Sequence, residues 1–340
     1  MSIFALNLNY NLAILPTTDK IWLAVILLII GLVGIIKGGD WFVDAAVWMA
    51  EVLHLPKFLI GATIVSVATT LPEMIVSIIA VAGANPNFSI SIGNAVGSVT
   101  ANTGLILAIG IIFTGGMINK KDFSIKTFLI IASTMVLLIF GLVNNKIGII
   151  PSILLFILFV VHMITTIKAA KEEKEENENK EVDKSKKAIF KNIMLFLIGT
   201  CGIVFGADLL VENAKIVAKA IGISDGIIAI TLVAIGTSLP ELITTVTAVI
   251  KKQGSLGIGN VIGANIIDLV LILSVCSAIS GWNLEVSSQS LVLDFPACLI
   301  VSIIATIPTI ISGKFKKWQG FLLLAVYAIY ITFAVIFFNK

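Results

Sequence analysis

Residues 61–74 read GATIVSVATTLPEM, and residues 229–242 read AITLVAIGTSLPEL. The two stretches begin 168 positions apart, and each ends with hydroxyl side chains followed by Leu-Pro-Glu. Both stand in apolar surroundings, where an ionisable Glu is costly and marks a functional site by default. Repetition of this motif decides the fold, because it indicates two copies of one membrane unit in a single chain.

Two further pairs of segments match at nearly the same distance. GGDWFV at residues 38–43 corresponds to GADLLV at residues 206–211, and SIGNAVGSVTAN at residues 91–102 corresponds to GIGNVIGANIID at residues 257–268. The most similar stretches are the polar ones. A duplication without a retained site has no need to keep costly polar residues inside lipid.

The composition excludes a soluble or disordered chain. Of the 340 residues, 58% are hydrophobic and 13% are charged, with a mean hydropathy of +1.08, whereas soluble domains are about 25% charged. All basic residues are Lys, with no basic stripe among aromatic residues, so we expect no nucleic-acid partner. Three cysteines without a CxxC pair and two isolated histidines predict neither a disulfide framework nor a zinc site.

Ten apolar segments predict membrane-spanning helices, for which about 20 mainly apolar residues are typical. They are residues 21–36, 41–82, 88–115, 122–143, 147–167, 192–211, 221–250, 256–281, 288–312 and 318–338. With five spans in each half, the second copy must enter the lipid bilayer from the opposite side, an arrangement typical of secondary transporters. We therefore expect an all-α membrane protein with ten transmembrane helices in two inverted five-helix repeats.

Charge divides the chain and sets its orientation. Residues 168–191 are dense in Lys, Asp and Glu, so we expect an N-terminal extension (1–20), a first repeat (21–167), a charged linker (168–191) and a second repeat (192–340). Lysines gather in alternate loops: those with Lys120, Lys121 and Lys126, the linker, Lys251 and Lys252, and Lys314, Lys316 and Lys317. The positive-inside rule then predicts a cytoplasmic linker and both termini outside, with Lys215 and Lys219 as exceptions. Without a visible targeting segment, we expect the plasma membrane.

Oxygen donors gather around each Leu-Pro-Glu motif. Ser66, Thr69, Thr70 and Glu73 share one helix face, and Pro72 should break the helix and free carbonyl groups. The second copy repeats this with Ala234, Thr237, Ser238 and Glu241, and the other matched stretches add Ser98, Asn102 and Asp268. We expect Asn94 and Asn260 to bond backbone groups where glycines let helices approach.

These donors are hard oxygen ligands, of which Ca²⁺ takes 6–8. Sulfur and imidazole ligands are missing nearby, which argues against copper, zinc and iron. Glu73, Glu241 and Asp268 would each cost about 2.5–3.5 kcal/mol if ionised at the bilayer centre. A bound cation would most simply offset the cost of these three charges, so the sequence predicts a cation site shared by both halves. We expect no permanently bound cofactor.

The paired ATTLPE and GTSLPE segments, each followed by GN-x-x-G, resemble the two alpha repeats of the calcium/cation antiporter superfamily, and most closely its sodium/calcium exchanger branch. The resemblance implies alternating access, in which the first span of each half slides across the rest. It also implies four cation sites at the midplane, with Glu73 and Glu241 as the central carboxylates shared by Ca²⁺ and Na⁺.

The same resemblance assigns the remaining ligands. Backbone carbonyls of Thr69 and Thr237 would complete the Ca²⁺ site, and Asn102 and Asp268 would flank a middle position. The outer Na⁺ positions would use the carbonyls of Ser66 and Ala234, the hydroxyls of Thr70 and Ser238, and Ser98. Two departures concern Ala264, where the family often has Ser, and Val99, where it usually has Asn. The first leaves open the Na⁺ stoichiometry and the use of Na⁺ itself.

The leading hypothesis is antiport of Na⁺ and Ca²⁺ with export of Ca²⁺. Antiport of H⁺ and Ca²⁺ is the main alternative, although H⁺-coupled members often carry Asn in both repeats, where this chain has Asn102 and Asp268. Another divalent cation such as Mn²⁺ would also accept oxygen ligands. A cation channel, a membrane enzyme and a non-transporting adaptor fit the inverted repeats less well. A monomer could suffice for transport, and the oligomeric state stays open.

Overall fold

The computed structural model describes residues 20–82, 86–117, 119–174, 182–221 and 236–338. Its helices, with η marking π-helices, are α1 (Ile21–Leu53), α2 (Lys57–Ile60), η1 (Gly61–Val65), α3 (Ser66–Thr69), α4 (Leu71–Ala82), α5 (Phe88–Ala101), η2 (Asn102–Leu107), α6 (Ala108–Thr114), α7 (Lys120–Asn144), α8 (Ile149–Lys174), α9 (Lys186–Ala220), α12 (Leu239–Ile250), α13 (Gly254–Ile266), η4 (Ile267–Ile272), α14 (Leu273–Ile279), η5 (Ser290–Asp294), α15 (Phe295–Ser312) and α16 (Lys317–Phe338). Within the described ranges, eight helices are long and apolar enough to cross a membrane, or nine if the bent pair over residues 57–82 counts as one span. The chain is therefore an all-helical, multi-pass membrane protein, and the expected span at 221–250 falls partly outside the described residues.

Three helices extend well beyond the predicted spans. α1 is one continuous helix of 33 residues, so the expected division between residues 36 and 41 is wrong, and the next span begins at Lys57. α9 has 35 residues and begins at Lys186, while α8 extends to Lys174, so both ends of the expected linker are helical. A helix of 33 residues is about 50 Å long, well beyond the ~30 Å hydrocarbon layer.

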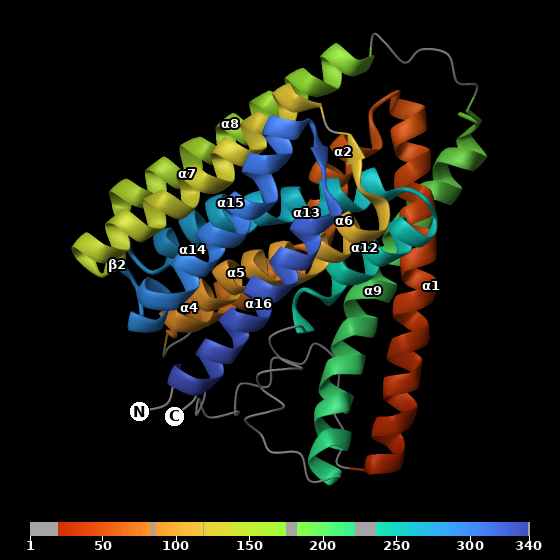
Figure 1. Ribbon diagram of the computed structural model, residues 1–340. Helices are drawn as coiled ribbons and strands as arrows, with labels where there is room; N and C mark the ends of the chain where they lie inside the picture. Colours follow the sequence, from red (N-terminus) through yellow and green to blue (C-terminus); the bar gives the residue numbers. More distant parts are fainter. Residues whose placement is uncertain (1–19, 83–85, 118, 175–181, 222–235, 339–340) are drawn as a thin grey trace.

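Glycines explain how α1 and α9 lie side by side along their length (Figure 1). A Cβ atom on Gly38 would lie 2.8 Å from the carbonyl oxygen of Gly199, and one on Gly206 would lie 2.9 Å from that of Gly31. Larger side chains at these positions would push the two backbones apart. The glycines that divide the apolar pattern of the sequence therefore form a helix contact and not a helix end.

Four two-residue strands join distant parts of the chain. β1 (Gly116–Met117) pairs antiparallel with β4 (Lys314–Phe315), and β2 (Lys146–Ile147) pairs antiparallel with β3 (Leu284–Glu285). Adding 168 to the first-half positions of one pairing gives the second-half positions of the other, so the two pairings have equivalent registers. β1 precedes α7 and β2 follows it, so a strand pair joins the two halves at each end of this helix.

The interior and the exterior of the bundle differ in side-chain character. The main apolar core comes from α5, η2, α7, α13, η4, α14 and α15, and a second core lies where α1 meets the start of the broken helix. Large apolar side chains are exposed along α8 and α16, among them Ile153, Phe156, Phe321 and Phe333. Such outward apolar surfaces suit contact with lipid.

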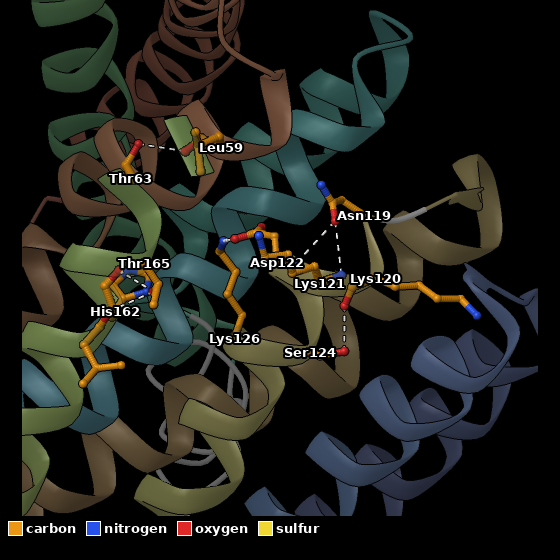
Figure 2. A network of polar contacts seen from close by, with 11 residues as sticks. Leu59, Thr63, Asn119, Lys120, Lys121, Asp122, Ser124, Lys126, His162 and Thr165 are labelled. Carbon is orange, nitrogen blue, oxygen red and sulfur yellow. Dashed lines mark hydrogen bonds and ion pairs between the residues drawn. The ribbon is translucent and has the colours of Figure 1, made fainter. Parts of the chain in front are cut away.

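A buried ion pair corrects one sequence expectation. Lys126 was counted among the loop lysines, but it lies inside α7 with 1% of its surface exposed. Its ammonium group lies 2.5 Å from both carboxylate oxygens of Asp122, as Figure 2 shows, and 5.3 Å from the ring centre of Phe58. The side chain of Asn119 caps the N-terminus of α7, where it accepts a hydrogen bond from the backbone N–H of Lys121 (Figure 2). The positive-inside argument therefore rests on the other lysines.

Candidate cation site

The first Leu-Pro-Glu motif lies at a break in its helix, as its proline predicts. The segments Lys57–Thr69 and Leu71–Ala82 meet at an angle of 44° around Thr70. Pro72 has no N–H to donate to the carbonyl four residues earlier, that of Ala68. Glu73 consequently falls in the first turn of α4, where its carboxylate also lies near the positive end of the helix dipole.

The second motif has the same local arrangement in the part that the structure describes. Ser238 directly precedes α12, whose first turn contains Pro240 and Glu241. Thr237 is half-buried in the turn before the helix. Ala234 lies outside the described residues, so its predicted role stays a prediction.

The three carboxylates of the predicted site are fully enclosed. Glu73 is 1% exposed, and Glu241 and Asp268 are 0% exposed. Glu73 is close enough to both other groups, and Asp268 to Glu241, for their negative charges to repel one another. Across the described residues, no three His, Cys, Asp or Glu side chains are arranged to hold one metal ion by themselves. Any bound cation would therefore need hydroxyl, amide or carbonyl oxygens as well.

Most of the polar atoms at this centre have no hydrogen-bond partner among the described residues. This holds for both carboxylate oxygens of Glu73, both of Asp268, Oε2 of Glu241, both side-chain polar atoms of Asn102, and the hydroxyl of Ser238. Buried polar groups are ordinarily hydrogen-bonded, because leaving them unpaired costs free energy. The unpaired carboxylate oxygens come from both halves and lie near one another, which indicates a binding site for a cation.

Hydroxyl groups near the carboxylates make hydrogen bonds within the first half and across to the second. Thr70 Oγ1 donates to the carbonyl of Ser66 at 2.7 Å and lies 3.5 Å from Oε1 of Glu241, so it links the two halves. Thr69 Oγ1 donates to Oδ1 of Asn260 at 3.1 Å. Ser66 Oγ donates to the carbonyl of Thr63 at 3.0 Å, and Ser98 is buried on α5. Each of these hydroxyls still has lone pairs for a cation.

The sequence did not predict the π-helical segments, two of which carry residues of the candidate site. Asn102 begins η2, and Asp268 is the second residue of η4, which occupies the matching place in the second half. Short π-helical segments within α-helices occur frequently at functional sites. Apolar periodicity could not identify them, because one extra residue per turn changes the pattern too little over six residues.

Other contacts around the site were missed or only partly foreseen. Asn94 Nδ2 bonds the backbone carbonyl of Glu73 at 3.0 Å, as its GN motif predicted. Asn260, in the second GN motif, instead contacts two side chains. Asn265 Nδ2 donates to Thr103 Oγ1 at 2.8 Å, a contact between halves for which the sequence offered no signal.

Enclosed carboxylates within a bundle of membrane-spanning helices are typical of proteins that move ions across a membrane. A family model described as sodium/calcium exchanger protein matches residues 23–168 and again residues 191–336. The chain therefore belongs to the sodium/calcium exchanger family, whose members are transporters and not enzymes, and the resemblance inferred from the motifs is confirmed.

Individual relatives cover nearly the whole chain. An uncharacterized membrane protein of Methanocaldococcus jannaschii is 35% identical over 88% of this chain and 94% of its own length. The sodium/calcium exchanger MaX1 of Methanosarcina acetivorans is 29% identical over 92% of this chain and 98% of its own. A structure of the sodium-calcium exchanger NCX_Mj, soaked with Na⁺ and Sr²⁺, superposes with a TM-score of 0.77 at 31% identity, covering 92% of this chain and 99% of that one.

Proposed function

We propose that this chain exchanges Na⁺ for Ca²⁺ by alternating access and exports Ca²⁺. The observation that carries the proposal is the set of buried carboxylate oxygens without hydrogen-bond partners, contributed by both halves. Oxygen ligands of this kind suit Ca²⁺ and Na⁺, and a cation offsets the cost of burying the charges. The names of MaX1 and NCX_Mj agree with this choice of ions.

In this proposal the predicted residues divide the ligand roles. Glu73 and Glu241 bind either ion, helped by the carbonyls of Thr69 and Thr237, while Asn102 and Asp268 flank the middle position. The outer Na⁺ ligands are the carbonyls of Ser66 and Ala234, the hydroxyls of Thr70 and Ser238, and Ser98. Burial of Ser66, Ser98 and Ser238 supports these roles.

The proposed architecture has ten spans in two inverted repeats, residues 21–167 and 192–340. Equivalent strand registers at an offset of 168 support the two-fold relation. The lysines of the loops favour a cytoplasmic linker (168–191), with the extension (1–20) and both termini outside, in the plasma membrane.

Coupling to H⁺ is the second candidate, and one residue favours it. Ala264 on α13 is 0% exposed and offers a methyl group where its first-half counterpart, Ser98, offers a hydroxyl. A missing hydroxyl weakens an outer Na⁺ position, whereas a carboxylate can exchange a proton without it. Asp268 favours Na⁺, because a third ionised carboxylate can balance a third Na⁺.

Purified protein in liposomes loaded with Na⁺ tests the proposal. On dilution into Na⁺-free buffer we expect uptake of radioactive Ca²⁺, abolished in Glu73→Gln and in Glu241→Gln. Glu285→Gln, at an exposed carboxylate in β3, is the matched control and should transport normally. Unchanged uptake in both site variants would refute the ligand assignment, and uptake driven only by a pH gradient in a parallel sample would favour H⁺ coupling.

A further inference from the structure

Asn260 joins the two carboxylate-bearing segments. It is 0% exposed on α13, where it accepts a hydrogen bond from Thr69 Oγ1 at 3.1 Å and donates from Nδ2 to Thr244 Oγ1 at 2.8 Å. Thr69 directly precedes the break that leads to Glu73. Thr244 lies one turn after Glu241 and donates to the backbone carbonyl of Glu241 at 3.0 Å. One amide therefore connects the broken helix of the first half to the helix of the second carboxylate.

The equivalent residue in the first half has different partners. Asn94 Nδ2 donates to the carbonyl of Glu73 and to Ser77 Oγ, both at 3.0 Å, so among the described residues its amide bonds within its own half. Thr237 is the counterpart of Thr69, yet among the described residues it makes no hydrogen bond to Asn94. The hydrogen bond between Thr69 and Asn260 is therefore formed, whereas its sequence equivalent, between Thr237 and Asn94, is absent from the described residues.

Close packing accompanies the bond of Asn260. Gly263, one turn after Asn260, approaches the first broken helix so closely that a Cβ would lie 2.6 Å from the carbonyl oxygen of Ala62. The hydrogen bond between Thr69 and Asn260 therefore lies within a tight contact between the two halves.

We propose that Asn260 and Asn94 are positioning residues whose hydrogen bonds to Thr69 and Thr237 form alternately during transport. The inference rests on the proposed function, in which one part of the bundle moves against the other around a site shared by the two inverted repeats. In the opposite state Thr237 bonds to Asn94, and Thr69 is released from Asn260. Each bond fixes the backbone just before one carboxylate, and with it the threonine carbonyl that is proposed to bind Ca²⁺.

Cross-linking tests this alternation without requiring any ion flux. Cys201, Cys276 and Cys298 are first replaced by Ser in the full chain, held in lipid vesicles. The pairs Thr69→Cys with Asn260→Cys, and Thr237→Cys with Asn94→Cys, are then treated with a short bis-methanethiosulfonate in Na⁺, in Ca²⁺ and in buffer without either ion. Each pair should cross-link by itself, whereas a chain with all four cysteines should contain one bridge or the other in each molecule.

Two outcomes of that experiment would overturn the proposal: both bridges in one molecule, or a second pair that never cross-links in any buffer. Failure of the proposed function is distinguishable, since it would appear as absent Ca²⁺ uptake by the parent protein with the bridges still alternating.

A second variant asks whether the hydrogen bond itself matters. Thr69→Val removes the hydroxyl that donates to Asn260 and keeps the backbone carbonyl, so it weakens the bond between the halves that is formed in the state described here. The bridging rate of the Thr237→Cys and Asn94→Cys pair should rise about fivefold, the factor for one neutral hydrogen bond of about 1 kcal/mol. Asn192→Ala is the control, because its amide bonds the carbonyl of Ala188 in its own helix. An unchanged or slower bridging rate in Thr69→Val would contradict the proposal.

Discussion

The ammonium group of Lys126 lies 2.5 Å from the carboxylate of Asp122, one turn earlier in α7, and both side chains are buried. Ion pairs that are shielded from water depend strongly on both partners, because a single remaining charge keeps its full desolvation cost. This pair lies outside the cation site, so its energetics can be measured separately from transport.

Removing one partner of this pair should destabilise the protein. Lys126→Met leaves Asp122 buried and unpaired, which we expect to lower the free energy of unfolding by about 3–5 kcal/mol. Thermal unfolding in detergent measures the loss. Lys317→Met, at an exposed position at the start of α16, is the control and should unfold like the parent. Equal melting temperatures for both variants would show that the pair contributes nothing.

The glycine contact between α1 and α9 predicts different results for two similar substitutions. Gly38→Ala places a methyl group 2.8 Å from the backbone oxygen of Gly199, so the helices must separate at a cost of about 1–3 kcal/mol. Gly34→Ala, about one turn earlier on the same helix, leaves an ordinary 3.4 Å contact with the oxygen of Gly202 and should be neutral or stabilising. Melting temperatures measured side by side test this order, and the reverse order would refute the close contact.

The contact between Asn265 and Thr103 should matter because it is buried. Thr103→Val leaves the amide of Asn265 without its acceptor, at an expected cost of about 1–3 kcal/mol in unfolding free energy. Thr127 is also buried in a helix, but its hydroxyl has no partner among the described residues, so Thr127→Val is the matched control. A loss of equal size in both variants would mean that the hydroxyl of Thr103 has no special role.

Restoring a hydroxyl at residue 264 should favour Na⁺. Under the proposed ligand assignment, Ala264→Ser adds one oxygen ligand to an outer position, so the Na⁺ concentration for half-maximal Ca²⁺ uptake should fall about fivefold, the factor for a contact worth about 1 kcal/mol. Ala278→Ser on the exposed face of α14 is the control. No change with Ala264→Ser would indicate that Na⁺ does not bind at this position.

Sequence reasoning predicted features that one residue type determines locally. Pro72 predicted the break observed at Thr70, because a missing N–H acts wherever the helix lies. Three acidic residues in apolar segments predicted the enclosed carboxylates, because an ionisable side chain is costly there unless it has a function. The family followed from the same motifs.

Features that depend on a distant partner were not predictable in this way. Gly38 was placed between two spans, although it lies within one helix and makes close contact with Gly199, far along the chain. Lys126 was taken for a loop residue because its partner, Asp122, is ordinary in sequence and only the fold encloses both. The π-helical turns at Asn102 and Asp268 shift single residues, which no apolar pattern records.

The strand pairs have a consequence for the synthesis of the protein. β1 and β2 lie in the first half, and both of their partners lie in the second. When the ribosome has completed α8, each of these strands still has its backbone edge unpaired, and β1 must wait for β4, almost two hundred residues later. Final assembly is therefore a late event for the entire chain, and a product truncated in the linker would present two open edges to other proteins.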